Sequence, residues 1–271
     1  MTNRWSWLCP WLAVALAASV FVLFGLTWWS ALLAAFLLVC PALLLWGLYI
    51  TRPGSDEPAV HTRGMTMNWA APFYDMYCRA VGLGQGFRDQ TLQVAAIQPG
   101  ETILDVGCGT GVLTRGAGEA AGKAGSTIGI DPGQDMIRVA KENAQRLGSR
   151  TEFKVAAIEQ LPFENARFDV VLSSLMLHHL PPDLKRQGLR EVYRVLKPGG
   201  RFIVADFYRP ANPLWWLVTW PFLFMHTTAD NFRGRLPAFF QAAGFDHITM
   251  RGRRAGIVTF WRAIKPEEKL S

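Results

Sequence analysis

Cysteine is scarce in this sequence of 271 residues, which contains only Cys9, Cys40, Cys78 and Cys108. Their spacing matches neither a metal-ligand pattern nor a disulfide framework. We therefore expect no metal site and no fold that depends on disulfide bonds. So few cysteines fit a reducing, cytosolic compartment for the soluble part of the chain.

Clusters of basic residues interleaved with aromatic residues, which are typical of nucleic-acid-binding surfaces, are also absent. The chain has 28 Lys and Arg against 21 Asp and Glu, a formal net charge of +7. The densest basic group, Arg251, Arg253 and Arg254, stands near the end of an expected strand, where charged side chains are commonly solvated. We expect no nucleic-acid partner, and an anionic membrane surface explains the positive charge more simply.

Charged residues are missing altogether from residues 5–51. A membrane-spanning helix needs about 20 apolar residues, so an uncharged run of about 45 is long enough for two. Gly25 relaxes the backbone at the expected turn, beside Trp28 and Trp29, which suit the headgroup level. The sequence therefore predicts a transmembrane helical hairpin over residues 1–51.

The charges that flank this hairpin predict its orientation. Arg4 precedes the first span and Arg52 follows the second, and positive charge tends to stay on the cytoplasmic side. Both ends, and the catalytic domain, are then expected in the cytoplasm. A cleaved signal peptide, with small residues at Ala15 and Ala17, and a buried helix pair are the alternatives. The signal peptide is disfavoured because the apolar run continues well past that site.

Beyond the hairpin, proline, glycine and charge indicate a linker, which we place at residues 52–64. The rest of the chain, residues 65–271, is predicted to form one domain. Predicted strands and helices alternate from Thr102 onward: strands begin at Thr102, Thr127, Glu152, Phe168 and Arg201, and helices at Val112, Gln134 and Asp183. Alternation of this kind predicts an α/β fold with a parallel sheet and helices on both faces. A helix at residues 231–243 and the apolar segments HITM and GIVTFW complete the prediction.

A glycine-rich segment, LDVGCGTG at residues 104–111, joins the first predicted strand to the helix at Val112. The N-terminus of that helix directs free N–H groups toward an anionic group near the loop. A dinucleotide-binding loop requires glycine at position 112, so a nicotinamide-dependent oxidoreductase is disfavoured. Asp105 precedes the glycines, and Asp131 ends the second strand, where a carboxylate can accept hydrogen bonds from two ribose hydroxyls.

Together with three later segments, this loop resembles the class I S-adenosylmethionine-dependent methyltransferases, in the branch similar to the ubiquinone and menaquinone biosynthesis enzymes (methyltransferase type 11). The segments are LDVGCGTG, GIDPGQDMI, EQLPFENARFDVVLSSLMLHHL and EVYRVLKPGGRFIVADF. The resemblance covers about residues 74–265 and implies a Rossmann-like seven-stranded sheet that ends in an antiparallel hairpin. It also implies S-adenosylmethionine as the cofactor.

The same resemblance implies where the cofactor binds. The loop would surround the methionine moiety, through Asp105, Gly107, Cys108, Gly109, Thr110 and Gly111. The ribose would be held by Asp131, next to Pro132. Ser173 or Ser174, at the end of the fourth strand, would lie beside the cofactor through its backbone.

One departure from the family concerns the adenine. Relatives often carry Asp or Asn where this chain has Ala157 followed by Ile158. The missing side-chain hydrogen bond is worth about 1.5–3 kcal/mol before compensation. The Ile158 backbone N–H and side chain are left to contact the purine, so we expect weaker or less selective adenine binding rather than none.

Catalysis of methyl transfer rests largely on positioning the acceptor in line with the sulfonium, so a general base is optional. The histidines His178 and His179, the phenol of Tyr74 and the carboxylate of Asp206 are the available bases near the expected cleft. We select His178 and Tyr74 as the candidate catalytic residues. Adjacent histidines often have one ring that faces inward and hydrogen-bonds the backbone, so a structural role is the competing interpretation of His178.

A second apolar segment, PLWWLVTWPFLFM at residues 213–225, follows the fifth strand and is too short to span a bilayer. It could lie in the membrane interface as part of an acyl or isoprenoid channel, or pack on the sheet. Because Trp215, Trp216 and Trp220 suit an interface, we favour membrane contact.

These observations predict a membrane-anchored methyltransferase that transfers a methyl group from S-adenosylmethionine to a lipophilic small molecule. A quinone ring, a lipid amine and a thiol are the acceptors considered, because oxygen, nitrogen, carbon and sulfur acceptors occur behind similar motifs. The alternative is a catalytically silent S-adenosylmethionine-binding scaffold or sensor at the membrane, for which Ala157 is the only hint. The sequence leaves the oligomeric state open.

Overall fold

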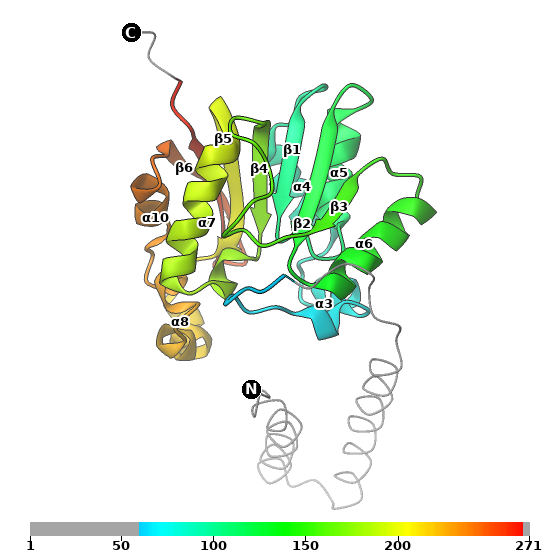
Figure 1. Cartoon of the computed structure of the whole chain (residues 1–271). Coiled ribbons are helices and arrows are strands. Elements are labelled where there is room, and N and C mark those ends of the chain that lie inside the picture. The colour runs from blue at the N-terminus through cyan, green and yellow to red at the C-terminus, as the bar shows by residue number, and fades with distance from the viewer. Residues whose placement is uncertain (1–59, 268–271) are drawn as a thin grey trace, which may run out of the picture. The chain divides into compact units, whose positions relative to one another are not determined.

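A computed structural model describes residues 60–267, apart from the side chains of Trp69, Leu217 and Val218 (Figure 1). The predicted transmembrane hairpin at residues 1–51 and most of the predicted linker at 52–64 lie outside the described residues. Among the helices that are described, none is both long enough and apolar enough to cross a membrane.

The centre of the domain is a seven-stranded sheet of order β3-β2-β1-β4-β5-β7-β6. Five strands pair in parallel: β1 (Thr102–Val106), β2 (Ser126–Asp131), β3 (Glu152–Val155), β4 (Phe168–Ser174) and β5 (Leu196–Phe207). The last two, β6 (Asp246–Arg254) and β7 (Val258–Ile264), form an antiparallel hairpin, and β7 pairs with β5. The predicted Rossmann-like α/β sheet with its final antiparallel hairpin is confirmed.

Helices cover both faces of this sheet, as predicted (Figure 1). One face carries α4 (Gln85–Ala95), α5 (Val112–Ala121) and α6 (Gln134–Arg146), and the other carries α7 (Pro182–Val195) and α10 (Leu236–Ala242). Successive side chains of a strand point to opposite faces. In β1, Ile103 therefore packs in the core beneath α5, whereas Leu104 joins the larger core beneath α7 and α10.

The remaining helices are short: η1 (Asn68–Ala70), α3 (Tyr74–Ala80), η2 (Leu177–His179), α8 (Pro213–Thr219), η3 (Trp220–Phe224) and α9 (Ala229–Phe232). Both α3 and α8 lie at the same end of the domain (Figure 1). This is the end at which the parallel strands finish, which we call the carboxyl edge of the sheet. In open α/β sheets, ligands bind at this edge.

The single helix predicted at residues 231–243 is wrong. α9 ends at Phe232 and α10 begins only at Leu236. Between them Gly234 has φ +80°, a left-handed conformation that favours glycine and interrupts the helix. Pro237 then lies in the first turn of α10, where its missing N–H costs nothing, whereas in the interior of a longer helix it would break the hydrogen-bond ladder.

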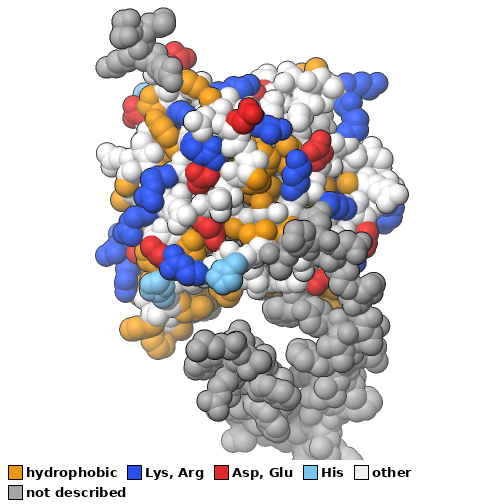
Figure 2. Space-filling view, viewed as in Figure 1, with side chains coloured by type: hydrophobic (Ala, Val, Ile, Leu, Met, Phe, Trp, Pro, Cys, Tyr) orange, Lys and Arg blue, Asp and Glu red, His pale blue; other side chains and the backbone are white. Residues whose placement is uncertain are grey.

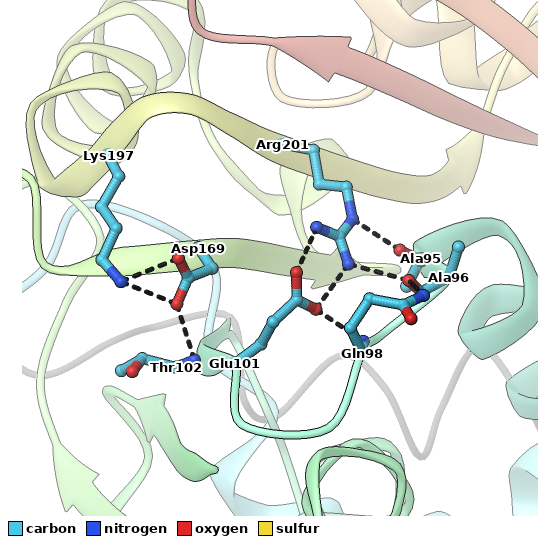
Figure 3. A network of polar contacts seen from close by, with 8 residues as sticks. All are labelled: Ala95, Ala96, Gln98, Glu101, Thr102, Asp169, Lys197 and Arg201. Carbon is cyan, nitrogen blue, oxygen red and sulfur yellow. Dashed lines mark hydrogen bonds and ion pairs between the residues drawn. The ribbon is translucent and has the colours of Figure 1, made fainter.

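The opposite, amino edge of the sheet is held by two sets of ion pairs (Figure 3). In the first, the Arg201 guanidinium of β5 donates to both oxygens of Glu101, each at 2.7 Å. The same side chain donates to the carbonyls of Ala95 and Ala96 at the end of α4, at 2.6 and 3.0 Å. One arginine therefore ties β5, the start of β1 and the end of α4 together.

In the second set, Lys197 donates to the two oxygens of Asp169, at 2.7 and 2.8 Å. Asp169 also accepts the backbone N–H of Thr102 at 2.8 Å. These contacts join β5, β4 and β1 across the centre of the sheet. Every acid in the two sets has a cationic partner.

Candidate active site

The loop between β1 and α5 requires glycine on both conformational and steric grounds. The φ angles of Gly107, Gly109 and Gly111 are +73°, +54° and +74°. A Cβ at Gly107 would overlap Cγ of Met176, and one at Gly111 would overlap Cζ of Phe153. The loop can therefore approach its neighbours this closely only without side chains.

Two cavities flank this loop at the carboxyl edge. The first, of about 680 Å³, we call the Asp131 pocket; the second, of about 440 Å³, we call the Asp105 pocket. Predicted cofactor residues that line the Asp131 pocket are Gly107, Gly109, Asp131, Pro132, Ala157 and Ile158. Those that line the Asp105 pocket are Asp105, Gly107, Cys108, Gly109, Thr110 and Ser174. The Tyr74 side chain lines both.

Two predicted cofactor residues line neither of these pockets. Ser173 is fully buried within β4. Gly111 caps the N-terminus of α5 and faces Phe153 rather than either cavity. The prediction that they lie beside the cofactor stays a prediction, whereas the other predicted cofactor residues are brought together around the loop.

Asp131, at the end of β2, is fixed by backbone donors. Its Oδ2 accepts the N–H of Gly109 at 3.1 Å, and its Oδ1 accepts the N–H of Gly133 at 2.8 Å. Burial raises the pKa of Asp131 to about 6 even though these two hydrogen bonds lower it. Since an ionised carboxylate can accept about four hydrogen bonds, Asp131 still has acceptor positions for ligand hydroxyls.

Asp105, in β1, is almost completely buried. Its Oδ2 accepts the hydroxyl of Thr114 at 2.7 Å, but its Oδ1 has no hydrogen-bond partner within the described residues. Burial raises the pKa of Asp105 to about 7, and the nearby charge of Asp131 adds to the effect. A buried acceptor without a partner is costly, so this oxygen suits a cationic or hydrogen-bond-donating ligand group.

Tyr74 of α3 lies across the loop between the two pockets. A Cβ on Gly109 would stand 3.5 Å from Cε1 of Tyr74, so the ring rests on the loop at ordinary contact distance. Burial raises the pKa of the Tyr74 phenol, and Cys78 reinforces the shift. The phenol is therefore protonated at physiological pH, and it shares a side-chain hydrogen bond with Cys78.

Asp75, which follows Tyr74 in α3, connects this helix to the glycine loop. Asp75 accepts the hydroxyl of Thr110 at 2.9 Å and the guanidinium of Arg88 at 3.1 Å. Arg115 of α5 donates to the Thr110 carbonyl at 3.0 Å. These contacts link α3, α4 and α5 to the loop and hold the tyrosine in place.

The two adjacent histidines after β4 have different positions. His178 is buried, and its Nδ1 lies 2.7 Å from Oδ1 of Asp206. Its ring lies between those of His179 and Phe207, at centroid distances of 4.1 and 4.7 Å. His178 lines neither pocket described above, whereas His179 lines the Asp131 pocket.

The electrostatics of the pair follow from this arrangement. Burial lowers the pKa of His179 to about 4, and the neighbouring His178 contributes to the decrease. His179 is therefore a neutral imidazole at physiological pH, with a ring lone pair but a lower basicity than an ordinary histidine. Burial opposes ionisation of Asp206, but its interactions with His178 outweigh that and lower its pKa. An ionised Asp206 orients His178 through the hydrogen bond to Nδ1.

One contribution to the site has no clear signal in the sequence. Thr62 and Gly64, within the predicted linker, line the Asp131 pocket together with residues 65–67. The backbone N–H of Met65 donates to the carbonyl of His179 at 3.0 Å. This extended segment therefore forms one wall of the pocket, held by a contact that spans more than a hundred residues of sequence.

Comparison with known proteins agrees with this geometry. Residues 103–200 match the family described as a methyltransferase domain. The chain is 33% identical over 208 residues to the ubiquinone/menaquinone biosynthesis C-methyltransferase UbiE of Ectopseudomonas mendocina, with 68% of this chain and 80% of that protein covered.

Solved structures share the fold. An S-adenosylmethionine-dependent methyltransferase from Aquifex aeolicus matches with a TM-score of 0.55 and 20% identity, over 74% of this chain and 100% of that one. Phosphoethanolamine N-methyltransferase 2 of Haemonchus contortus, in complex with S-adenosyl-L-methionine, matches with a TM-score of 0.54 and 17% identity, over 68% and 53%.

The sheet and the glycine-loop pockets define a class I S-adenosylmethionine-dependent methyltransferase. Within that class, the chain belongs to the UbiE-like methyltransferases. The predicted enzyme class and the predicted cofactor are both confirmed.

The residues of the two pockets fit S-adenosylmethionine. The unpartnered Oδ1 of Asp105 suits the ammonium group of the methionine portion. The carboxylate of Asp131 suits the ribose hydroxyls, and the buried side chains of Ala157 and Ile158 suit the adenine ring. When bound, the cofactor supplies an electrophilic methyl group on a sulfonium.

Proposed function

We propose that this protein methylates a lipophilic small molecule and that, among the acceptors considered, a quinone-type ring is the first to test. The observation that carries the proposal is the 33% identity to a named ubiquinone/menaquinone C-methyltransferase, combined with a complete pair of pockets around the glycine loop. A lipid amine and a hydrophobic thiol are the other acceptors.

In this proposal the cofactor lies across both pockets, with Asp105 near the methionine ammonium and Asp131 on the ribose. Tyr74 lies between the two pockets and exchanges its hydrogen bond with Cys78 for one to a ligand group at their junction. Because α3 is fixed to the loop through Asp75, the tyrosine positions the reactants without large movement. Positioning of this kind supplies much of the rate in a displacement reaction.

Methylation of a ring carbon forms a carbon–carbon bond as the sulfonium–methyl bond breaks, and the ring must then lose a proton. We propose that neutral His179, at the wall of the Asp131 pocket, accepts this proton directly or through the acceptor hydroxyl. His178, the histidine selected from the sequence, is then a positioning residue. Its hydrogen bond to Asp206 holds the η2 turn that carries His179.

Membrane attachment forms part of the proposal. The uncharged run of residues 5–51 supports a transmembrane hairpin at 1–51, with the catalytic domain in the cytoplasm. A lipophilic acceptor would then reach the enzyme from the bilayer. Ala157 favours a second candidate, a catalytically silent S-adenosylmethionine-binding protein at the membrane, since the adenine loses a side-chain hydrogen bond there.

The test uses the full-length protein with S-adenosylmethionine labelled in its methyl group and total lipid extracted from a host lacking this protein. We expect label in the quinone fraction, with a mass increase of one methyl group. Asp131→Ala serves as the inactive control. Binding of S-adenosylmethionine without label in any lipid, quinone or thiol would establish the silent protein instead.

A further inference from the structure

The segment formed by α8 and η3 presents large apolar side chains to solvent. Leu214 is 67% exposed, Trp220 56% and Phe224 80%. Figure 2 shows hydrophobic side chains gathered at this lower end of the molecule, over α8, with Lys, Arg and His side chains above them. We call Leu214, Trp220, Phe222, Phe224 and Met225 the apolar tip. A grouped apolar surface, unlike scattered apolar residues, marks an interaction site.

An open groove of about 1460 Å³ adjoins the apolar tip, between α7, η3 and α10. Three arginines line it: Arg186 of α7, and Arg233 and Arg235 in the turn between α9 and α10. The one acid among the lining residues is Asp230, which pairs with Arg235 at 3.2 Å. Three guanidinium groups and one carboxylate leave a net charge of +2.

Two of these arginines lack a carboxylate partner within residues 60–267. The Arg186 guanidinium lies 5.3 Å from the ring centroid of Phe239, and Arg233 donates only to the carbonyl of Leu223, at 3.0 Å. Each therefore keeps several N–H donors free. A planar guanidinium can donate two parallel hydrogen bonds to a phosphate, which makes phosphate the matching ligand chemistry.

The groove has a fixed shape in the protein. Lys185, which is fully buried in α7, donates to the carbonyl of Thr227 at 2.6 Å and so ties the chain after η3 to α7. The bond from Arg233 to Leu223 ties η3 to α9. The arginines are thus presented on a preformed wall that adjoins the apolar tip, because Phe224 and Met225 line the same groove.

We propose that this groove binds the phosphate headgroup of an anionic phospholipid while the apolar tip enters the membrane interface. The tip and the arginines stand side by side, which matches the acyl and headgroup layers of a membrane surface. A soluble phosphate compound would account for the arginines but not for the tip. The inference does not depend on which acceptor is methylated, and it involves residues 182–242 rather than the predicted hairpin.

Hydrogen exchange of the full-length protein tests this proposal. The protein is mixed with phosphatidylcholine vesicles, with or without phosphatidylglycerol. We expect amides of residues 220–235 to exchange more slowly with phosphatidylglycerol than without it. Each arginine near an anionic surface strengthens attachment by about fivefold, so the Arg186→Glu/Arg233→Glu variant should need at least about 30-fold more phosphatidylglycerol vesicles for the same protection.

A matched control reverses two exposed arginines outside the groove, Arg150→Glu/Arg190→Glu. It has the same net charge as the groove variant, and Arg190 lies on the same helix as Arg186. We expect the control to keep the protection. Both double variants should bind S-adenosylmethionine like the unmodified protein, which shows that they are folded and separates this test from that of methyl transfer.

Four results would overturn the proposal. Equal protection on both vesicle types would show that the headgroup is not recognised. Protection by inorganic phosphate without vesicles would indicate a soluble ligand. Protection that rises with protein concentration alone would indicate a second copy of the chain, and loss of protection in the control variant would indicate net charge rather than the groove.

Discussion

Glu101 and Asp105 stand at opposite ends of β1, and their surroundings differ in kind. At the amino edge Glu101 receives the Arg201 guanidinium on both oxygens. Burial opposes its ionisation, but the bonds from Arg201 and Gln98 outweigh this and lower the pKa of Glu101. At the carboxyl edge Asp105 has one hydroxyl donor and no cation, and burial raises its pKa to about 7.

The comparison separates residues that hold the fold from residues that bind a ligand. An acid paired with a cation contributes to stability in the ligand-free protein. A buried acid without such a partner costs stability and is favourable only when a ligand completes its hydrogen bonds. Asp131, whose pKa is raised to about 6, belongs with Asp105. The amino edge therefore stabilises the protein, and the carboxyl edge is incomplete without its cofactor.

The largest expected effect is on cofactor binding after Asp131→Ala. The change removes the acceptor that we propose for the ribose hydroxyls, and hydrogen bonds to a charged acceptor are worth about 1.5–3 kcal/mol each, so affinity should fall by about 100-fold or more. Calorimetry with S-adenosylmethionine measures it. Glu101→Gln, at the other edge, should leave the affinity within about twofold. Equal losses in the two variants would contradict the division between the edges.

The histidine pair gives the next largest effect, on turnover. His179→Ala should lower kcat by about 100-fold if the imidazole accepts the proton, as general bases commonly contribute that much. His178→Ala should reduce kcat less, and His178→Gln should restore part of it by keeping a bond to Asp206. The assay is methyl transfer at saturating S-adenosylmethionine. If His178→Ala is the more damaging change at unchanged thermal stability, the roles are reversed.

Stability should change in opposite directions at the two edges. Glu101→Gln leaves Arg201 without its charged partner, so the free energy of unfolding should fall by about 1–3 kcal/mol. Asp105→Asn removes an ionised group whose pKa rises from 3.8 to about 7 on folding, so at pH 8 it should raise the unfolding free energy by about 1–4 kcal/mol. Urea unfolding of ligand-free protein measures both. The contrast between the two edges would be contradicted if the Asp105→Asn variant folds normally but has a lower free energy of unfolding than the unmodified protein.

The same two acids predict how cofactor binding depends on pH. In the proposed site the ionised carboxylates bind the cofactor, and burial raises the pKa values of Asp131 and Asp105 to about 6 and about 7. Protonation below these values should weaken S-adenosylmethionine binding at least about tenfold between pH 8 and pH 5. Ligand-free stability should have the opposite trend over this range, because raised carboxyl pKa values make the folded state bind protons more tightly.

Titrations of Kd and of unfolding free energy across this range check both trends. Asp105→Asn should show a shallower dependence in each. A cofactor affinity that is constant from pH 8 to pH 5 would show that these acids do not contact the cofactor.

The sequence predicted the features that depend on short-range pattern. Short apolar runs that end in turn residues predicted where two strands begin, at Thr102 and Phe168. The same pattern predicted the glycine loop and the position of Asp131 at the end of β2. The break at Gly234 was missed: an isolated glycine is compatible with a continuous helix, but Pro237 inside the predicted range was a local signal for a new helix start.

Features that depend on distant contacts could not be predicted. Which of two adjacent histidines faces the pocket depends on the η2 turn, after Leu175 at φ +52°, and on the position of Asp206 in β5. The pocket wall formed by Thr62 and Gly64 depends on a hydrogen bond from Met65 to His179. Neither the orientation of the histidines nor the bond from Met65 to His179 can be inferred from local residue patterns.

The smallest expected effect is a gain at the carboxyl edge. Ala157 lines the Asp131 pocket, and the family resemblance implies an acid or amide at this position for the adenine amine. Ala157→Asp should strengthen S-adenosylmethionine binding by about five- to tenfold, less than a full charge-assisted hydrogen bond because the new carboxylate must itself be buried. Calorimetry compares the binding of S-adenosylmethionine with that of its inosine analogue, which lacks the adenine amine. The comparison shows whether the gain in affinity comes from a hydrogen bond to that amine. A gain for the adenine compound alone identifies the restored hydrogen bond, whereas an equal change for both would show that position 157 does not contact the amine.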